Sequence, residues 1–133
     1  MYRPVASREV RYADLDLWPF RIKAGMWAWI LHRVTGLVIV FYLVLHILVI
    51  SSVLWGPGTF DATMNALRRP VFAAGELMLV AAGLYHGLNG IRIILFDLGV
   101  GIRQQKAFFA GVLALSVVGF AWAAKVFWPL IFG

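Results

Sequence analysis

The stretch Leu84–Gly99, which reads LYHGLNGIRIILFDLG, places one histidine inside an apolar segment and ends that segment with charged residues. In a helix, three small or polar residues share a face with His86: Gly83, Asn89 and Gly90. Small residues allow a flat, bulky group to approach the imidazole, and histidine is a common axial ligand of haem iron. The alternative is a histidine hydrogen-bonded inside a helix bundle, whose small neighbours help the helices pack. The stretch therefore predicts an intramembrane helix that carries a haem ligand or a packing histidine.

The composition indicates a membrane protein. The 133 residues are 62% hydrophobic and 14% charged, and the mean hydropathy is +0.86. Soluble domains usually have about a quarter charged residues. There is no cysteine, which excludes a disulfide, an iron–sulfur cluster of the chain's own and a thiolate zinc site. Any redox chemistry here must use a cofactor held by histidine or bound without covalent ligands.

Three apolar segments follow a polar N-terminal arm of residues 1–23. Each segment exceeds the roughly 20 residues that a transmembrane helix needs. The linker Trp55–Pro70 contains Gly56, Pro57 and Gly58, which break helices. The sequence thus predicts an all-α membrane protein with one transmembrane domain, residues 24–133. The predicted spans are about residues 27–54, 71–96 and 107–132.

The basic residues predict the orientation. Nine of the twelve lysines and arginines lie in the arm or at the ends of spans on the same side as the arm. By the positive-inside rule the N-terminus is expected to be cytoplasmic and the C-terminus outside. This orientation explains the net charge of +6, so the charge does not indicate binding of nucleic acid. The first twenty residues are mixed and charged, so no secretory signal peptide is expected.

Two histidines lie at different predicted depths. His86 is about 15 residues, or roughly 22 Å, from the outer end of its helix, and His46 is about 19 residues, or roughly 28 Å, from the inner end of the first span. They are therefore not expected to ligate one haem within this chain. Either each pairs with a histidine of another subunit, giving two haems, or only one is a ligand. The helical neighbours of His46 leave less room for a porphyrin than those of His86, and they are Tyr42, Leu43, Val49 and Ile50. The alternative role of His46 is a hydrogen bond across helices or to interfacial water.

Three further polar residues lie near the predicted cytoplasmic interface. His32 and Arg33 are adjacent, and Arg92 is about 9 Å nearer the cytoplasm than His86. An arginine there can bind a haem propionate or donate a hydrogen bond to a quinone carbonyl. The alternative for Arg33 is an interfacial arginine whose charged end extends into water.

Two motifs together resemble the cytochrome b membrane subunit of succinate dehydrogenase and its fumarate reductase relatives. The first is WILHRVTG, in which His32 and Arg33 are followed by Thr35 and Gly36. The second is LYHGLNGIRIILFDLG, and its matching positions are His86, Gly90, Arg92 and Asp97. The resemblance covers all three spans in number and order.

The resemblance implies a three-helix anchor, half of a helical bundle that a second membrane subunit completes. It implies that the membrane is the cell's inner (cytoplasmic) membrane. It implies an iron–sulfur subunit and a flavoprotein subunit on the cytoplasmic face, with quinone as substrate. It also implies that His86 is a haem b ligand, with His32 and Arg33 near the propionates or the quinone. The haem would be shared with the partner subunit. In having a histidine at position 46, the chain resembles the family members that carry two haems.

The chain departs from the family pattern at two positions. Many members have a serine four residues before the motif arginine, where it contacts quinone, and this chain has Trp29. The usual contact is therefore not expected, although an indole N–H can donate. Some members have a histidine after the Arg92 position, where this chain has Ile93.

These observations predict a membrane anchor and haem b subunit of succinate:quinone oxidoreductase. Electrons from succinate would arrive through the iron–sulfur subunit and reduce quinone, and this chain would do no succinate chemistry. One alternative is a fumarate reductase anchor that runs the same reaction in reverse. Another is a cofactor-free structural or transport subunit, although three unrepeated spans offer no inverted halves.

Overall fold

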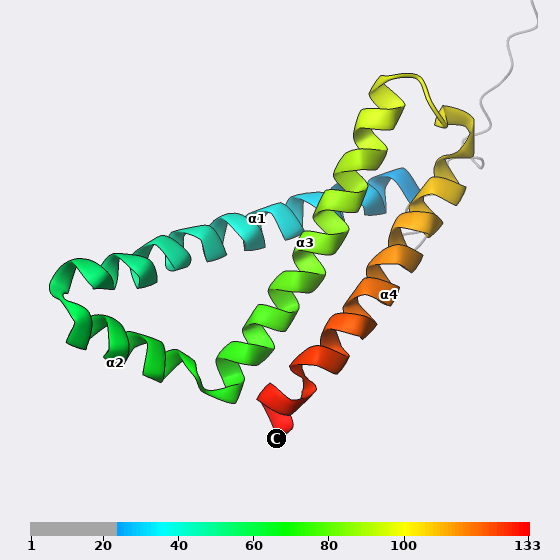
Figure 1. Ribbon diagram of the computed structural model, residues 1–133. Coiled ribbons are helices and arrows are strands. Elements are labelled where there is room, and N and C mark those ends of the chain that lie inside the picture. The colour runs from blue at the N-terminus through cyan, green and yellow to red at the C-terminus, as the bar shows by residue number, and fades with distance from the viewer. Residues whose placement is uncertain (1–23) are drawn as a thin grey trace, which may run out of the picture.

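The computed structural model describes residues 24–133, and the N-terminal arm lies outside the described residues. This part of the chain consists of helices joined by short turns (Figure 1). Three helices are long and apolar enough to cross a membrane, within Gly25–Trp55, Pro70–Asp97 and Ile102–Phe132. The predicted number and order of spans are confirmed. The helices are α1 (Ala24–Ser51), α2 (Pro57–Leu67), α3 (Pro70–Asp97) and α4 (Gln105–Phe132), with 3₁₀ turns η2 (Ser52–Trp55) and η3 (Ile102–Gln104).

The junction after α1 breaks the helix as predicted, but the linker is not a loop. Gly56 has φ +97°, a conformation that side chains disfavour and that ends the preceding helical segment. Pro57 then occupies the first turn of α2, where its missing N–H costs nothing and its fixed φ suits a helix. The sequence prediction treated the glycines and proline as breakers over the whole linker, whereas the proline also starts a new helix.

The junctions at both ends of α3 follow from local chemistry. Arg69 is extended, with ψ 147°, and precedes Pro70, as expected because a following proline disfavours the helical region. At the other end, Gly99 has φ +82°, Gly99 N–H donates to Phe96 O, and Val100 N–H donates to Leu95 O. This is the Schellman arrangement that closes a helix. It directs the chain back towards α4.

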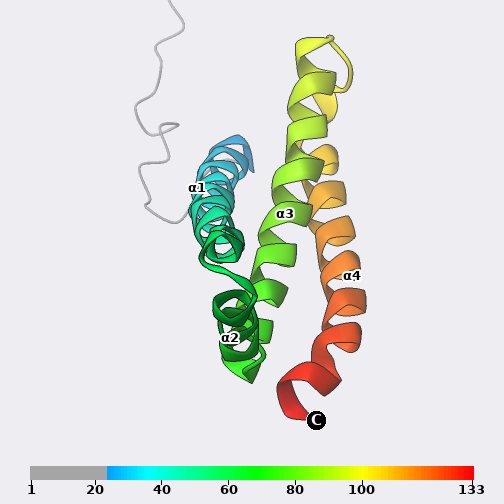
Figure 2. The same ribbon diagram turned by 60° about the vertical axis from the view of Figure 1, so that its left-hand side comes forward.

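Helices α3 and α4 lie side by side along most of their length, while α1 crosses α3 obliquely near its middle (Figures 1 and 2). A side chain at Gly119 of α4 would come within 2.9 Å of Leu84 Cδ1 of α3, so the glycine permits the close approach of the helices. Near η3, the rings of Phe96 and Phe108 meet edge to face with centroids 5.5 Å apart.

The interior between the helices is small and the outer faces are apolar. The buried hydrophobic residues are Ala28, Ala82, Tyr85, Val112 and Ala123. Large apolar side chains are exposed along every span, including Leu37 at 71%, Val118 at 68% and Trp122 at 72%. Lipid or a partner subunit must cover such surfaces. The chain is therefore a multi-pass membrane protein, and its exposed faces are consistent with a bundle that a partner completes.

Candidate functional site

The crossing of α1 and α3 brings two of the predicted site residues into direct contact. The rings of His32 and His86 are stacked, with centroids 3.9 Å apart and planes inclined by 9°. Both side chains are half-buried. The sequence predicts His32 near the cytoplasmic interface and His86 roughly 22 Å from the outer end of its helix, but it does not predict the contact between their rings.

Glycines flank the stacked rings. A Cβ atom at Gly36 would lie 3.0 Å from His86 Cε1, which is tighter than ordinary van der Waals contact, so only glycine fits without displacement. A Cβ at Gly90 would lie 3.9 Å from His32 Cε1, an ordinary contact. At Gly83 and Gly87, no atom of the described chain would lie within 4 Å of an added Cβ, beyond the neighbouring residues and the helix backbone. This side of α3 is open beside His86.

Hydrogen bonding sets the tautomer of His86. Its Nδ1 lies 3.1 Å from the carbonyl oxygen of His32. A carbonyl only accepts, so Nδ1 carries the proton and donates it. The Thr35 hydroxyl lies 3.3 Å from the same nitrogen. Nε2 is then left with its lone pair, which is the form of imidazole that binds a metal.

Two buried side chains fasten α3 to α1 beside the histidines. The Tyr85 hydroxyl donates to Ala28 O at 3.3 Å, and the Asn89 amide donates to the same oxygen at 3.5 Å. Tyr85 is 6% exposed, Asn89 1% and Ala28 1%. Buried polar groups need such partners because their desolvation is costly. The sequence alone indicates no role for Tyr85, and for Asn89 it indicates only a shared helix face with His86.

Arg92 is buried in the span, where its guanidinium cation is only partly satisfied. Its Nη1 donates to Asn89 Oδ1 at 3.4 Å, and its Cζ lies 4.5 Å from the centre of the Phe96 ring. Its Nε has no hydrogen-bond partner among the described residues. A guanidinium that is 6% exposed and has a free N–H is suited to an anionic or carbonyl ligand.

Arg33 and Trp29 lie together on α1, away from the stacked rings. Arg33 Cζ is 4.0 Å from the centre of the Trp29 ring, within the range of a cation–π contact. Both side chains are exposed. The guanidinium stays accessible while the indole fixes its place along the helix.

His46 lies on α1 far from the other two histidines. His32 is level with His86 and precedes His46 by fourteen residues, or about 21 Å along a helix. The two histidine sites are thus separated along α1, although α1 is inclined to α3 and the distance along it is not a depth in the membrane (Figure 1). His46 is exposed, and the Tyr42 hydroxyl lies 3.5 Å from its Nδ1.

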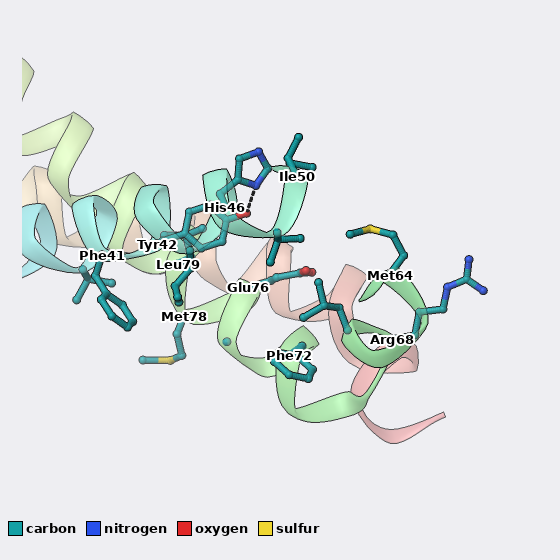
Figure 3. Close-up of a pocket in the computed structure, with 15 residues that line it drawn as sticks. Phe41, Tyr42, His46, Ile50, Met64, Arg68, Phe72, Glu76, Met78 and Leu79 are labelled. Carbon is teal, nitrogen blue, oxygen red and sulfur yellow. Dashed lines mark hydrogen bonds between the residues drawn. The ribbon is translucent and has the colours of Figure 1, made fainter. Parts of the chain in front are cut away.

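The crowding expected around His46 is not found. The side chain borders a groove of about 770 Å³ between α1, α2 and α3 (Figure 3). Glu76 extends into the same region from α3, and the wall is largely apolar, with Phe41, Phe72 and Leu79. The residues that predicted crowding around His46 all lie on α1. The oblique crossing moves this end of α1 away from α3 and opens the space.

The donor set at the helix crossing fits a haem. It offers an imidazole with a free Nε2 lone pair, open glycine positions beside that imidazole, and a buried cation one and a half turns further along α3. Among the described residues no cluster of three or more His, Cys, Asp or Glu could hold a bare metal ion. A cofactor with its own equatorial ligands requires only one or two side-chain donors.

Comparison with known proteins identifies one family of membrane subunits. A family model described as "Succinate dehydrogenase/Fumarate reductase transmembrane subunit" matches residues 7–123. The succinate dehydrogenase hydrophobic membrane anchor subunit of Halobacterium salinarum is 40% identical over 108 residues, which cover 80% of this chain and 82% of that protein. The succinate dehydrogenase 2 membrane subunit SdhC of Mycobacterium tuberculosis is 41% identical over 88 residues, 65% of each chain. The hydrophobic membrane anchor subunit of Archaeoglobus fulgidus is 28% identical over 93 residues, covering 70% and 76%.

Proposed function

The chain belongs to the succinate dehydrogenase/fumarate reductase transmembrane subunit family, and from this premise we propose that it binds haem b and helps to deliver electrons to quinone. Its role as a membrane anchor subunit of succinate dehydrogenase follows from the family and from the three spans. Succinate chemistry takes place on other subunits under this proposal. This chain holds the complex in the bilayer and contributes residues to its redox groups.

The observation that carries the proposal is the hydrogen bond from His86 Nδ1 to the His32 carbonyl. It holds the imidazole in one tautomer and would leave Nε2 to bind the iron of a haem. Haem, when bound, supplies a one-electron carrier within the membrane. Gly83 and Gly87 would leave room for the porphyrin edge. The absence of a side chain at Gly36 lets His86 approach α1 closely.

The arginines have distinct proposed roles. Arg92 is held inside the span by Asn89 and keeps Nε free, which suits a haem propionate. Arg33 is exposed on α1 and stacked on Trp29, which suits a quinone carbonyl near the cytoplasmic interface. His32, with a buried Nδ1 that has no partner among the described residues, lies against His86 and could donate to either group.

His46 is proposed as the ligand of a second haem in a complex that carries two. The groove beside it has a volume of about 770 Å³, within the range of pockets that hold cofactors. Its distance along α1 from the histidine pair requires a separate iron. A histidine of a partner subunit would also hold each haem.

The proposed assembly contains a second membrane subunit, an iron–sulfur subunit and a flavoprotein subunit. The N-terminus and the basic end of the bundle face the cytoplasm under the positive-inside rule. The first exposed residues of α1 and the η3 turn would then lie nearest the iron–sulfur subunit. Haem shared between two membrane subunits would stabilise their association, because it binds the assembled state.

The decisive experiment is a reduced-minus-oxidised spectrum of the purified complex, with haem quantified per copy of this chain. We expect a b-type signal in the native complex, and we expect His86→Ala to remove the haem held at His86 while the chain still inserts. His46→Ala is the matched control: if one haem is bound it leaves the signal intact, and if two are bound it removes one. No haem in the native complex, or full haem content in His86→Ala, would contradict the proposal.

The reaction direction separates the two quinone-linked alternatives. Succinate oxidation with a quinone acceptor, compared with fumarate reduction by the corresponding quinol, measures which direction is faster in the native complex. A colourless complex without either activity would favour the cofactor-free structural or transport subunit.

A further inference from the structure

We infer that Asn89 is a positioning residue that fixes both the stacked histidines and the Arg92 guanidinium, and so tunes the redox potential of the haem at His86. The inference rests on the proposed haem site and deepens it. Asn89 touches neither the proposed iron ligand atom nor solvent. It acts through the residues on either side of it in α3 and through the backbone of α1.

Asn89 is the largest side chain in the described chain that is almost completely buried, with 1% exposure. A polar amide inside a membrane span is expensive unless both of its ends are bonded. Here both ends are used, because Nδ2 donates to Ala28 O and Oδ1 accepts from Arg92 Nη1. The two bonds fix the rotation of the amide, since exchanging its nitrogen and oxygen would lose both.

The bond to α1 lies one turn from the histidine pair. Ala28 precedes His32 by four residues, and Asn89 follows His86 by three, so the bond holds the two helices in one register at the stacked rings. Tyr85 donates to the same Ala28 oxygen from the position before His86. The helix contact is therefore clamped on both sides of His86 along α3.

The bond to Arg92 determines where a positive charge sits. Arg92 has a long, flexible side chain that would otherwise extend towards the nearest water. Its bond to Asn89 and its contact with Phe96 keep the guanidinium inside the span. A positive charge held near a haem favours the reduced form electrostatically, and the low dielectric of the membrane strengthens the effect.

The test is Asn89→Leu in the purified native complex. Leucine has the same number and branching of side-chain heavy atoms as asparagine and makes neither hydrogen bond. We expect the haem potential to fall by about 59 mV, a tenfold change in the equilibrium constant for a one-electron couple, because Arg92 moves away. We also expect shifted g-values in the electron paramagnetic resonance (EPR) spectrum of the oxidised haem, because the orientation of the imidazole plane relaxes.

The matched control is Asn65→Leu, the same substitution at an exposed position of α2, which should leave the potential and g-values unchanged. A merely structural asparagine would lower the yield of complex without altering the potential or spectrum of the haem that remains. Unchanged potential and g-values in Asn89→Leu would overturn the inference.

Two results separate this inference from the proposed function. A native complex without haem contradicts the haem proposal itself and leaves nothing for Asn89 to tune. If Asn89→Leu assembles without haem, the isosteric variant Asn89→Asp tests the positioning role instead. Aspartate keeps an acceptor for Arg92 and loses the amide donation to Ala28. Altered g-values in that variant support the positioning role, and native g-values with native potential overturn it.

Discussion

Gly36 shows how one missing side chain determines the geometry of the histidine pair. Its α-carbon faces His86 so closely that even a methyl group must move the ring. We expect Gly36→Ala to displace the His86 ring slightly and to lower the occupancy of the haem held at His86, because a site that must bind iron tolerates little movement of its ligand. The measurement is haem per assembled complex. Gly58→Ala, where nothing lies within 4 Å among the described residues, is the control, and equal haem content in both variants would contradict the expectation.

Arg92 illustrates a residue that is retained at a cost to stability. Its single hydrogen bond within the described chain is to Asn89, and a buried cation without an opposite charge is destabilising. We expect Arg92→Met to lower haem affinity about tenfold, as loss of a charge-assisted contact predicts, without lowering the thermal stability of the haem-free complex. Haem retention during dilution and the melting temperature measure the two effects. Native haem retention together with a lower melting temperature would indicate a purely structural arginine.

The individual site residues could be predicted from sequence, but their contacts could not. His86, Arg92 and His32 were found because ionisable groups are rare inside apolar spans. The stacking of His32 on His86 depends on the angle at which α1 crosses α3, which periodicity along one helix does not specify. Asn89 and Tyr85 carried a weaker signal, since an uncharged polar residue in a span is common, and only its burial reveals that it joins two helices.

At the scale of elements, the turn between α3 and α4 depends on glycine conformation. Gly101 has φ +79°, and an added Cβ there would overlap the Phe108 ring. We expect Gly101→Ala to destabilise the α3–α4 pair by at least about 1–2 kcal/mol from the left-handed backbone alone, with the Phe108 overlap adding to it. Thermal unfolding of the complex in detergent measures this loss.

Gly58→Ala again serves as the reference for the turn variant, because Gly58 is within a helix and has open space around it. If Gly101→Ala were as stable as Gly58→Ala, the turn would not depend on the left-handed conformation.

Element boundaries were largely predictable, with one exception. The apolar segments predicted α1, α3 and α4 to within a few residues, because a span must be long, apolar and interrupted by charge or glycine. Helix α2 was missed since its eleven residues are too few and too mixed to give a strong periodic signal. A proline directly after a glycine was the available clue, as it favours a helix start as much as a helix end.

At the scale of the whole molecule, three candidate membrane-crossing helices predict that the two termini lie on opposite sides of the membrane. The positive-inside rule predicts a cytoplasmic N-terminus. Because the chain has no cysteine, single-cysteine reporters give a clean readout. We expect Ser7→Cys to react with a membrane-impermeant thiol reagent only from the cytoplasmic side, and Gly58→Cys only from the outside. The reverse pattern would invert the proposed orientation and move the quinone site to the other face.

The hydrogen bond that orients His86 also has a consequence for genetic variation. Its acceptor is a main-chain oxygen of α1, and every amino acid at position 32 would supply that oxygen. A mutation of His32 can therefore change the stacking surface without deleting the acceptor that keeps the proton on Nδ1. A substitution at position 32 would therefore test the proposed role of the His32 ring by itself, because the backbone oxygen that accepts from His86 stays in place.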